Sequence, residues 1–264
     1  MTICRLPSQP SSKAPIRGAA TTLMLMLVGV VGCPEIQIPD PAVHYIAFGD
    51  SSTDGPAERG YPEILRDMLG EAAETFAQEG KGGETARDGL DRLGMILSKD
   101  LYPNAHTLLY WQGAAAIIDF IQEVDGLLLF SPAAAAYPFS SELDKTLDRV
   151  QVDIEAAIAQ ARAAGLTVYV ATYFFSREAI QPCEPLFLDV ILPGQARHAN
   201  DYITLLNARI RQAAANTGAA LVDLAAVDAE IRSDAANFFD CSHLSAKGNA
   251  IVARCFLQAI SQTE

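Results

Sequence analysis

The chain has 264 residues, half of them apolar, which is the composition of a globular protein and not of a disordered one. Its 32 acidic residues outnumber its 19 Lys and Arg residues and give a formal net charge of −13. A surface this acidic repels phosphate backbones, so we expect no nucleic-acid partner. The 4 histidines lack metal-ligand spacing and no CxxC pair is present, so we expect no metal site.

The N-terminus has the pattern of a bacterial export signal. Its charged residues are all basic and precede an apolar run that ends at Gly32 and is too short for a stable membrane anchor. The small residues before Cys33 resemble the lipobox of bacterial lipoproteins, in which the Cys carries the lipid. We therefore predict a lipoprotein signal peptide over residues 1–32, lipidation of Cys33, and a Pro-rich tether over 33–43.

This interpretation places the mature protein outside the cytoplasm. It would be exported and held by the lipid on Cys33 to the bacterial cell envelope, at the periplasmic face or the cell surface. The alternative is an ordinary cleaved signal peptide with a chance Cys at its end.

From residue 44 onward, short β-type runs alternate with longer amphipathic helical patterns. Strand–helix alternation predicts parallel strands joined by right-handed crossovers. We therefore expect one domain over residues 44–264, folded as a three-layer α/β/α sandwich with a mainly parallel sheet. In chain order the predicted elements are strand 44–48, helix 60–70, strand 74–78, helix 85–97, strand 107–111, helix 114–124, helix 141–164, strand 167–175, helix 201–217, strand 219–224 and helix 245–260.

Chemistry in an open parallel sheet lies in the loops that leave the carboxyl ends of the strands. A serine hydroxyl is a poor nucleophile unless a base lies within hydrogen-bond reach and an acid orients that base. Asp240 and His243 can supply the acid and the base from one turn, and Ser51, after the first strand, can supply the nucleophile. The candidate loops are residues 49–55 (GDSSTDG), 80–83 (GKGG), 112–115 (QGAA) and 240–243 (DCSH).

These motifs resemble those of the SGNH, or GDSL-type, ester hydrolases. The GDS triplet that ends at Ser51 is similar to the first block of the family, which holds the nucleophile. The D-x-x-H block is similar to residues 240–243. The resemblance spans residues 44–260 and implies a flavodoxin-like sandwich with a catalytic triad of Ser51, His243 and Asp240 and no cofactor.

The oxyanion hole is the second part of the resemblance. Residues 80–85 (GKGGET) look like the second block, usually G-x-S-G-x-T, in which the second Gly donates a backbone N–H to the hole. The resemblance therefore implies that the N–H groups of Ser51 and Gly83 receive the oxyanion.

The third block departs from the family pattern. The family shows G-x-N-D, whose Asn side chain is an oxyanion donor, but Ala115 stands at the Asn position here. A methyl group cannot donate, and losing one such donor typically costs roughly 3–4 kcal/mol of transition-state stabilisation. Three explanations remain open: a hole with two backbone donors, a substitute donor such as Gln112, or a degenerate enzyme.

The resemblance implies a serine ester hydrolase that cleaves carboxylic esters, acyl or acetyl, of a small substrate through an acyl-enzyme, similar to lysophospholipases and arylesterases. The alternatives are a catalytically impaired lipoprotein that only binds, and a carbohydrate O-deacetylase on the same scaffold. Two predicted long connections, residues 127–138 and 181–200, contain apolar residues that suit an acyl chain or simply pack on the domain.

Each of these residues, taken alone, could also have a purely structural role. Ser51, Asp240 or His243 alone could cap a helix. We expect Asp50 to be a hydrogen-bonding partner within its own loop, and Trp111 to pack in the core.

The cysteines after the signal add one further expectation. An oxidising compartment would allow Cys183, Cys241 and Cys255 to form one disulfide and leave one thiol. Cys241 lies inside the predicted catalytic turn, and a disulfide from it to Cys183 or Cys255 would hold that turn in place.

Overall fold

The computed structural model describes residues 38–126, 140–183 and 189–263. The predicted signal peptide, Cys33 and the first part of the tether lie outside these residues, as does the predicted connection 127–138. Export and lipidation therefore stay predictions.

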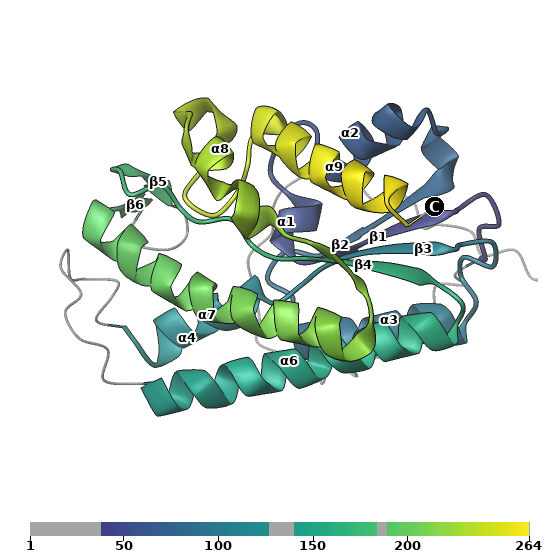
Figure 1. Cartoon of the computed structure of the whole chain (residues 1–264), viewed down its shortest axis with the longest axis horizontal. Coiled ribbons are helices and arrows are strands. Elements are labelled where there is room, and N and C mark those ends of the chain that lie inside the picture. The colour runs from purple at the N-terminus through teal and green to yellow at the C-terminus, as the bar shows by residue number, and fades with distance from the viewer. Residues whose placement is uncertain (1–37, 127–139, 184–188, 264) are drawn as a thin grey trace, which may run out of the picture. The chain divides into compact units, whose positions relative to one another are not determined.

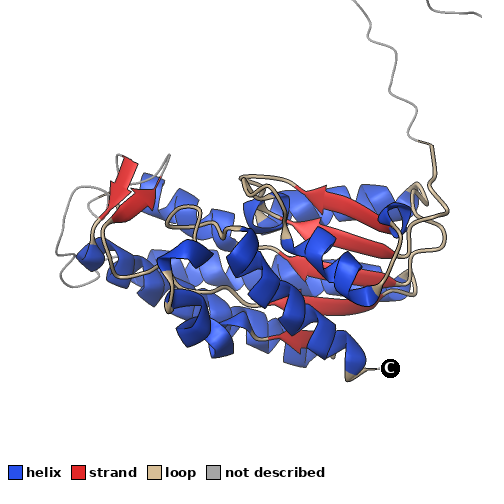
Figure 2. Cartoon of the chain, turned by 90° about the horizontal axis from the view of Figure 1, so that it is seen from above, coloured by secondary structure: helices blue, strands red, loops and turns tan. Residues whose placement is uncertain are grey.

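In the described part of the chain, the central sheet has five parallel strands in the order β2-β1-β3-β4-β7. Every residue of β1 and β3 is buried, as expected for strands covered on both faces. Figure 2 shows the strands side by side. The strands are β1 (Tyr45–Gly49), β2 (Phe76–Gly80), β3 (Thr107–Trp111), β4 (Thr167–Ala171) and β7 (Ala220–Val222).

Helices cover both faces of the sheet, which completes the predicted three-layer sandwich (Figure 1). Helices α2 (Tyr61–Leu69) and α9 (Ala246–Ser261) pack together on one face. On the other face α6 (Ser140–Ala163) lies between α3 (Ala86–Ser98) and α7 (Pro193–Thr217), and contacts both. The shorter helices are α1 (Ser51–Asp54), α4 (Ala114–Glu123) and α8 (Asp228–Arg232).

Several predicted strands differ from the observed ones at their ends; the strand predicted over 219–224, for example, is observed as Ala220–Val222. The strand predicted over 167–175 ends at Ala171. The Thr172 N–H still donates to the Val222 carbonyl of β7 at 3.1 Å, but from Tyr173 onward the backbone N–H groups bind side chains. The N–H of Tyr173 donates to Asn207 Oδ1 at 2.7 Å, for example. The strand predicted over 74–78 begins at Phe76, because the residues before it form a 3₁₀ turn.

The connection predicted over 181–200 contains regular structure. Strands β5 (Gln181–Cys183) and β6 (Asp189–Ile191) form an antiparallel pair, and α7 begins at Pro193 and not at residue 201. A proline suits the first turn of a helix because its missing N–H would have no partner there. The side chain of Gln195 also accepts a hydrogen bond from the Leu192 N–H at 2.9 Å, which fixes the start of the helix.

The strand order brings the predicted site residues to one edge. The chain leaves β1 toward β2 on one side and then crosses to β3 on the other, so the sheet has a switch point at β1, where ligands bind in open α/β folds. Gly49 and Gly80 permit close packing there. A Cβ at Gly49 would collide with the Trp111 carbonyl oxygen, and one at Gly80 with the backbone of Asp54.

Candidate active site

Ser51 is the first residue of α1, directly after β1, and is partly buried. The cap of that helix is Asp50, whose carboxylate accepts the Ser52 N–H at 2.9 Å. The capping role is therefore filled by the preceding residue, which leaves the Ser51 hydroxyl available for another role.

Asp50 reaches beyond its own loop. Its Oδ2 accepts hydrogen bonds from the Ala114 N–H at 3.2 Å and from the Tyr173 hydroxyl at 2.5 Å, so one buried carboxyl joins the ends of three strands. Burial raises the pKa of the Asp50 carboxyl, although these hydrogen bonds and that from Ser52 oppose the rise. Sequence reasoning expected only the local role. The missing partner, Tyr173, gave no signal, because its position after β4 becomes apparent only in the fold.

Asp240 and His243 form the predicted pair on one turn. His243 Nδ1 lies 2.9 Å from Asp240 Oδ2 and 3.1 Å from Oδ1, and Asp240 Oδ1 also accepts the backbone N–H of His243 at 2.8 Å. Burial alone would raise the pKa of Asp240, but the hydrogen bonds from His243 and Ser242 outweigh it and lower that pKa. The carboxylate is therefore negatively charged at neutral pH and can orient the imidazole ring.

A disulfide holds this turn against the neighbouring loop. Cys241 is bonded to Cys183, which is one of the two partners expected from the sequence, and Cys255 is a free, partly buried thiol. The Cys241 N–H also donates to the Pro182 carbonyl at 2.8 Å, and Ser176 Oγ donates to the Cys241 carbonyl at 2.6 Å. The turn that contains His243 is thus attached to β5 and to the segment after β4.

Ser51 and His243 line the same small cavity, of about 10 Å³, together with Trp111 and Phe174. Trp111 is buried and packs against Tyr61 and Phe174, as predicted. Within the described residues no hydrogen bond joins the Ser51 hydroxyl to the His243 ring. Catalytic hydrogen bonds are often long in free enzymes and shorten when substrate binds.

A second, apolar pocket of about 80 Å³ opens beside Ser51. Its apolar walls come from two parts of the chain that are far apart in the sequence. Helix α4 supplies Ile117 and Ile118, and the consecutive elements β6 and α7 supply Ile191 and Ile203. Ile191 belongs to the connection whose apolar residues were predicted to suit an acyl chain. Residues 184–188 of that connection lie outside the described part.

The predicted oxyanion loop lies next to the nucleophile. A Cβ on Gly82 would lie 3.9 Å from the Ser51 Cβ. Gly83 has a φ of +73°, a left-handed backbone conformation that favours glycine. The loop is attached to the nucleophile segment through the Lys81 N–H, which donates to the Gly49 carbonyl at 2.9 Å.

Ala115 lies buried in the first turn of α4, where it offers no side-chain donor. Gln112 is buried as well, and its Nε2 donates to the carbonyl oxygens of Glu84 at 3.1 Å and Thr85 at 2.9 Å. These two bonds engage both N–H groups of the amide. This geometry argues against Gln112 as the substitute oxyanion donor.

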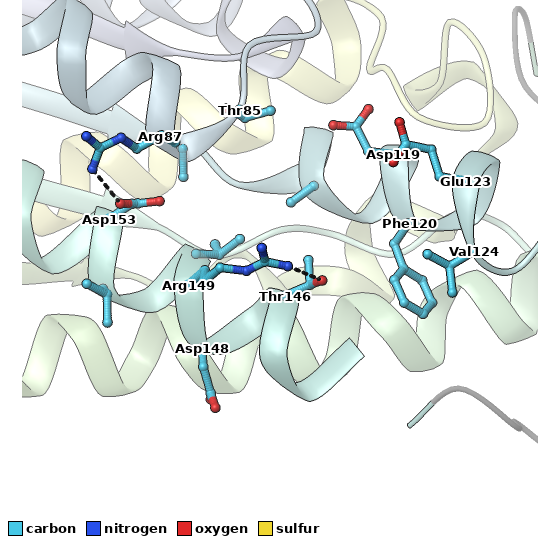
Figure 3. A pocket seen from close by; sticks show the side chains of 14 residues that line it. Thr85, Arg87, Asp119, Phe120, Glu123, Val124, Thr146, Asp148, Arg149 and Asp153 are labelled. Carbon is cyan, nitrogen blue, oxygen red and sulfur yellow. Dashed lines mark hydrogen bonds and ion pairs between the residues drawn. The ribbon is translucent and has the colours of Figure 1, made fainter. Parts of the chain in front are cut away.

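A larger hollow lies elsewhere in the described part of the chain. A groove of about 740 Å³ runs between the start of α3, α4 and α6, and none of Ser51, Asp240 and His243 lines it. Figure 3 shows Arg87 paired with Asp153 on one side and the carboxylates of Asp119 and Glu123 on the other.

Among the described residues, no three His, Cys, Asp or Glu side chains are grouped so that they could hold a metal ion. No helix in that part of the chain is both long enough and apolar enough to cross a membrane.

The sequence profile of the GDSL-like lipase/acylhydrolase family matches residues 47–251. The chain belongs to this family. It is therefore classed with enzymes that hydrolyse acyl esters, as the resemblance of its motifs implied. No curated protein matches the chain by sequence.

Solved structures of GDSL-type hydrolases share the fold at low sequence identity. An acetylxylan esterase from Geobacillus stearothermophilus is 18% identical with a TM-score of 0.54, covering 85% of this chain and 96% of that one. An esterase from Pseudoalteromonas sp. is 15% identical with a TM-score of 0.53, covering 83% and 97%. A lipolytic protein of the G-D-S-L family from Veillonella parvula is 15% identical with a TM-score of 0.58, covering 83% and 99%. These likenesses show the fold.

Proposed function

We propose that the chain is a serine ester hydrolase that works through an acyl-enzyme, with Ser51 as nucleophile, His243 as general base and Asp240 as the acid that orients it. The observation that carries the proposal is the pairing of the Asp240 carboxylate with His243 Nδ1, on a turn that shares a cavity with Ser51. Such a pair beside a serine is the arrangement that activates a hydroxyl for acyl transfer.

The reaction follows from these positions. Because Asp240 holds Nδ1 of the imidazole, Nε2 is the nitrogen left to take the proton from the Ser51 hydroxyl as it attacks the ester carbonyl. The N–H groups of Ser51 and Gly83 receive the negative charge that develops on the carbonyl oxygen. His243 then returns the proton to the leaving alcohol. Water cleaves the acyl-enzyme in a second step, with His243 again as base.

The apolar pocket beside Ser51 supports an acyl chain longer than acetyl. Its aliphatic walls would remove methylene groups from water, and each buried methylene contributes about 0.8 kcal/mol, which is about fourfold in kcat/KM. This favours the lysophospholipase- or arylesterase-like alternative over the carbohydrate deacetylase. The likeness to acetylxylan esterases keeps deacetylation as the second candidate.

Two measurements on purified protein test this. A fluorophosphonate probe should label the wild-type chain on Ser51, because such probes react only with an activated serine, and no labelling would favour the non-catalytic binding lipoprotein. A series of p-nitrophenyl esters from acetyl to octanoyl should show kcat/KM rising beyond acetyl. A maximum at acetyl would favour the deacetylase.

We also propose that a lipid on Cys33 anchors the mature protein to the cell envelope, on the strength of the apolar run and the small residues before that Cys. Replacement of Cys33 by Ala should move the protein from the membrane fraction to the soluble fraction. Unchanged association with membranes in this variant would contradict the proposal.

A further inference from the structure

The segment after Gly83 is held by a buried carboxylate. Glu84 is 4% exposed, and its side chain points inward from an otherwise exposed loop. Both of its carboxylate oxygens accept from Arg92 of α3, Oε1 from Nε at 2.7 Å and Oε2 from Nη2 at 2.7 Å. This bidentate ion pair fixes the orientation of the Glu84 side chain as well as its distance from α3.

Arg92 also balances the charge of the buried carboxylate. It donates to Glu79 Oε2 at 2.7 Å, and its guanidinium lies 4.0 Å from the centre of the Phe48 ring. A buried carboxylate without such a partner would be costly. Lys81 Nζ also lies 3.6 Å from Glu84 Oε1, so two cations, Arg92 and Lys81, face the two carboxylates near the loop that is proposed to receive the oxyanion.

Gln112 holds the same segment from the end of β3. Its amide donates to the carbonyls of Glu84 and Thr85, the two residues that follow Gly83, and Nε2 also lies 3.3 Å from Glu84 Oε2. Helix α3 leaves room for this amide only because residue 89 is Gly: a Cβ there would lie 2.7 Å from Gln112 Nε2.

The oxygen of the Gln112 amide, unlike its nitrogen, lacks a hydrogen-bond partner among the described residues. This oxygen, Oε1, is buried. Buried acceptors of this kind are rare in folded proteins, and each one calls for an explanation. The amide nitrogen, in contrast, donates to two backbone carbonyls, which an aliphatic side chain could not do.

We infer that Gln112 and Glu84 are positioning residues that fix the direction of the Gly83 N–H, so that two backbone donors suffice where Ala115 supplies none. The inference rests on the proposed function. Loop 80–83 contains three glycines and is conformationally permissive by itself. A donor stabilises the transition state only when it lies within about 2.7–3.1 Å of the developing oxyanion. A loop without fixed conformation would not hold the Gly83 N–H at that distance.

The test replaces Gln112 by Met, which keeps the length of the side chain and removes the amide. We expect kcat for p-nitrophenyl butyrate to fall about tenfold while KM changes less than twofold, because a misdirected donor affects charge that exists only in the transition state. Inhibition by a trifluoromethyl ketone, which forms a tetrahedral adduct, should weaken by the same factor as kcat/KM. The control is Gln151→Met, which removes a side-chain amide on α6 that bonds to Glu155, and it should leave kcat unchanged.

Gly89→Ala provides a second variant if Gln112→Met does not fold. Alanine favours a helix, and its Cβ would push the Gln112 amide away from its position. We expect kcat to fall severalfold, again with little change in KM. Normal kcat in both folded variants would overturn the inference and leave the proposed function intact. Absence of turnover and of labelling in the wild-type protein would overturn both.

Discussion

Helix α4 separates two hollows that differ in size and character. Ile117, Ile118 and Ile121 line the apolar pocket beside Ser51, which has a volume of about 80 Å³. Asp119 and Glu123 line the groove of about 740 Å³ on the other side of the same helix. The helical period of 3.6 residues explains how one short segment can present an apolar face to one hollow and an acidic face to the other.

In this fold, the convergence of polar and apolar groups identifies the site better than pocket volume does. The smaller pocket receives residues from the loops after β1 and β4, from β6 and from the disulfide-bonded turn. The larger groove is made by three helices, and its Arg87 is paired with Asp153 and Asp91. Volume alone would therefore point away from Ser51 and His243.

The largest effect is expected for Ser51→Ala, which tests whether the active site lies at the pocket beside Ser51 and not in the groove. We expect kcat to fall by roughly 10⁴-fold or more and fluorophosphonate labelling to disappear, because the nucleophile is lost while the fold is retained. Ser52→Ala, the adjacent hydroxyl, should change kcat by less than about threefold. If Ser52 carried the label instead, the alignment of the first motif would be wrong, and circular dichroism would confirm that both variants are folded.

Two tryptophan substitutions, one on α4 and one at the residue that caps its C-terminus, compare the hollows directly. Ile118→Trp should fill the apolar pocket and lower kcat/KM for a hexanoyl ester by roughly tenfold or more, while the acetyl ester is affected much less. Val124→Trp adds the same bulk on the groove side and should leave both esters unchanged. If only Val124→Trp altered the chain-length profile, the acyl group would occupy the groove instead.

Much of the fold could be predicted because the deciding signals are local. The apolar runs of β1 and β3 and the amphipathic pattern of α2 each fix one element. The pair β5–β6 was missed because it is short and depends on its partner. The early end of β4 was missed because side chains from α7 and α8 bind the backbone after it.

The predicted triad residues were found from motifs, since Ser51, Asp240 and His243 each lie at a recognisable turn. Their supporting contacts could not be found in that way. Tyr173 reaches Asp50, and Gln112 reaches Glu84, only because separate strands and loops meet at one edge of the sheet. Such contacts depend on tertiary packing and leave no periodic or local pattern in the sequence.

Ala115 lies between the two hollows, since Ala114 lines the pocket and Ala116 the groove. Ala115→Asn should add a side-chain donor to the proposed oxyanion hole and raise kcat for a short-chain ester about tenfold, with little change in KM. The gain is smaller than the 10²–10³-fold typical of a well-placed donor, because the grafted side chain lacks supporting contacts. A decrease in kcat in the folded variant would contradict the placement of Ala115 at the hole.

The smallest expected effect compares one carboxyl group from each hollow. Burial raises the pKa of Asp50, beside the pocket. Partial desolvation and the nearby carboxylates of Glu123 and Asp88 raise the pKa of Asp119, in the groove, although its side chain is exposed. A carboxyl with a raised pKa binds its proton more tightly in the folded state. Its contribution to stability is therefore fully present below the unfolded pKa of about 3.8 and is lost as the pH rises through the folded pKa.

Asparagine does not titrate, so Asp50→Asn should remove this loss. The free energy of unfolding of Asp50→Asn minus that of wild type should increase as the pH rises from 4 to 7. Urea unfolding at each pH measures this difference. Asp119→Asn should change in the same direction but much less, because Asp119 is exposed and solvent screens its charge. If the free energies of unfolding of Asp50→Asn and wild type changed in parallel with pH, the buried carboxyl would not favour its protonated form. The hydrogen bonds from Tyr173, Ser52 and Ala114 would then compensate fully for its burial.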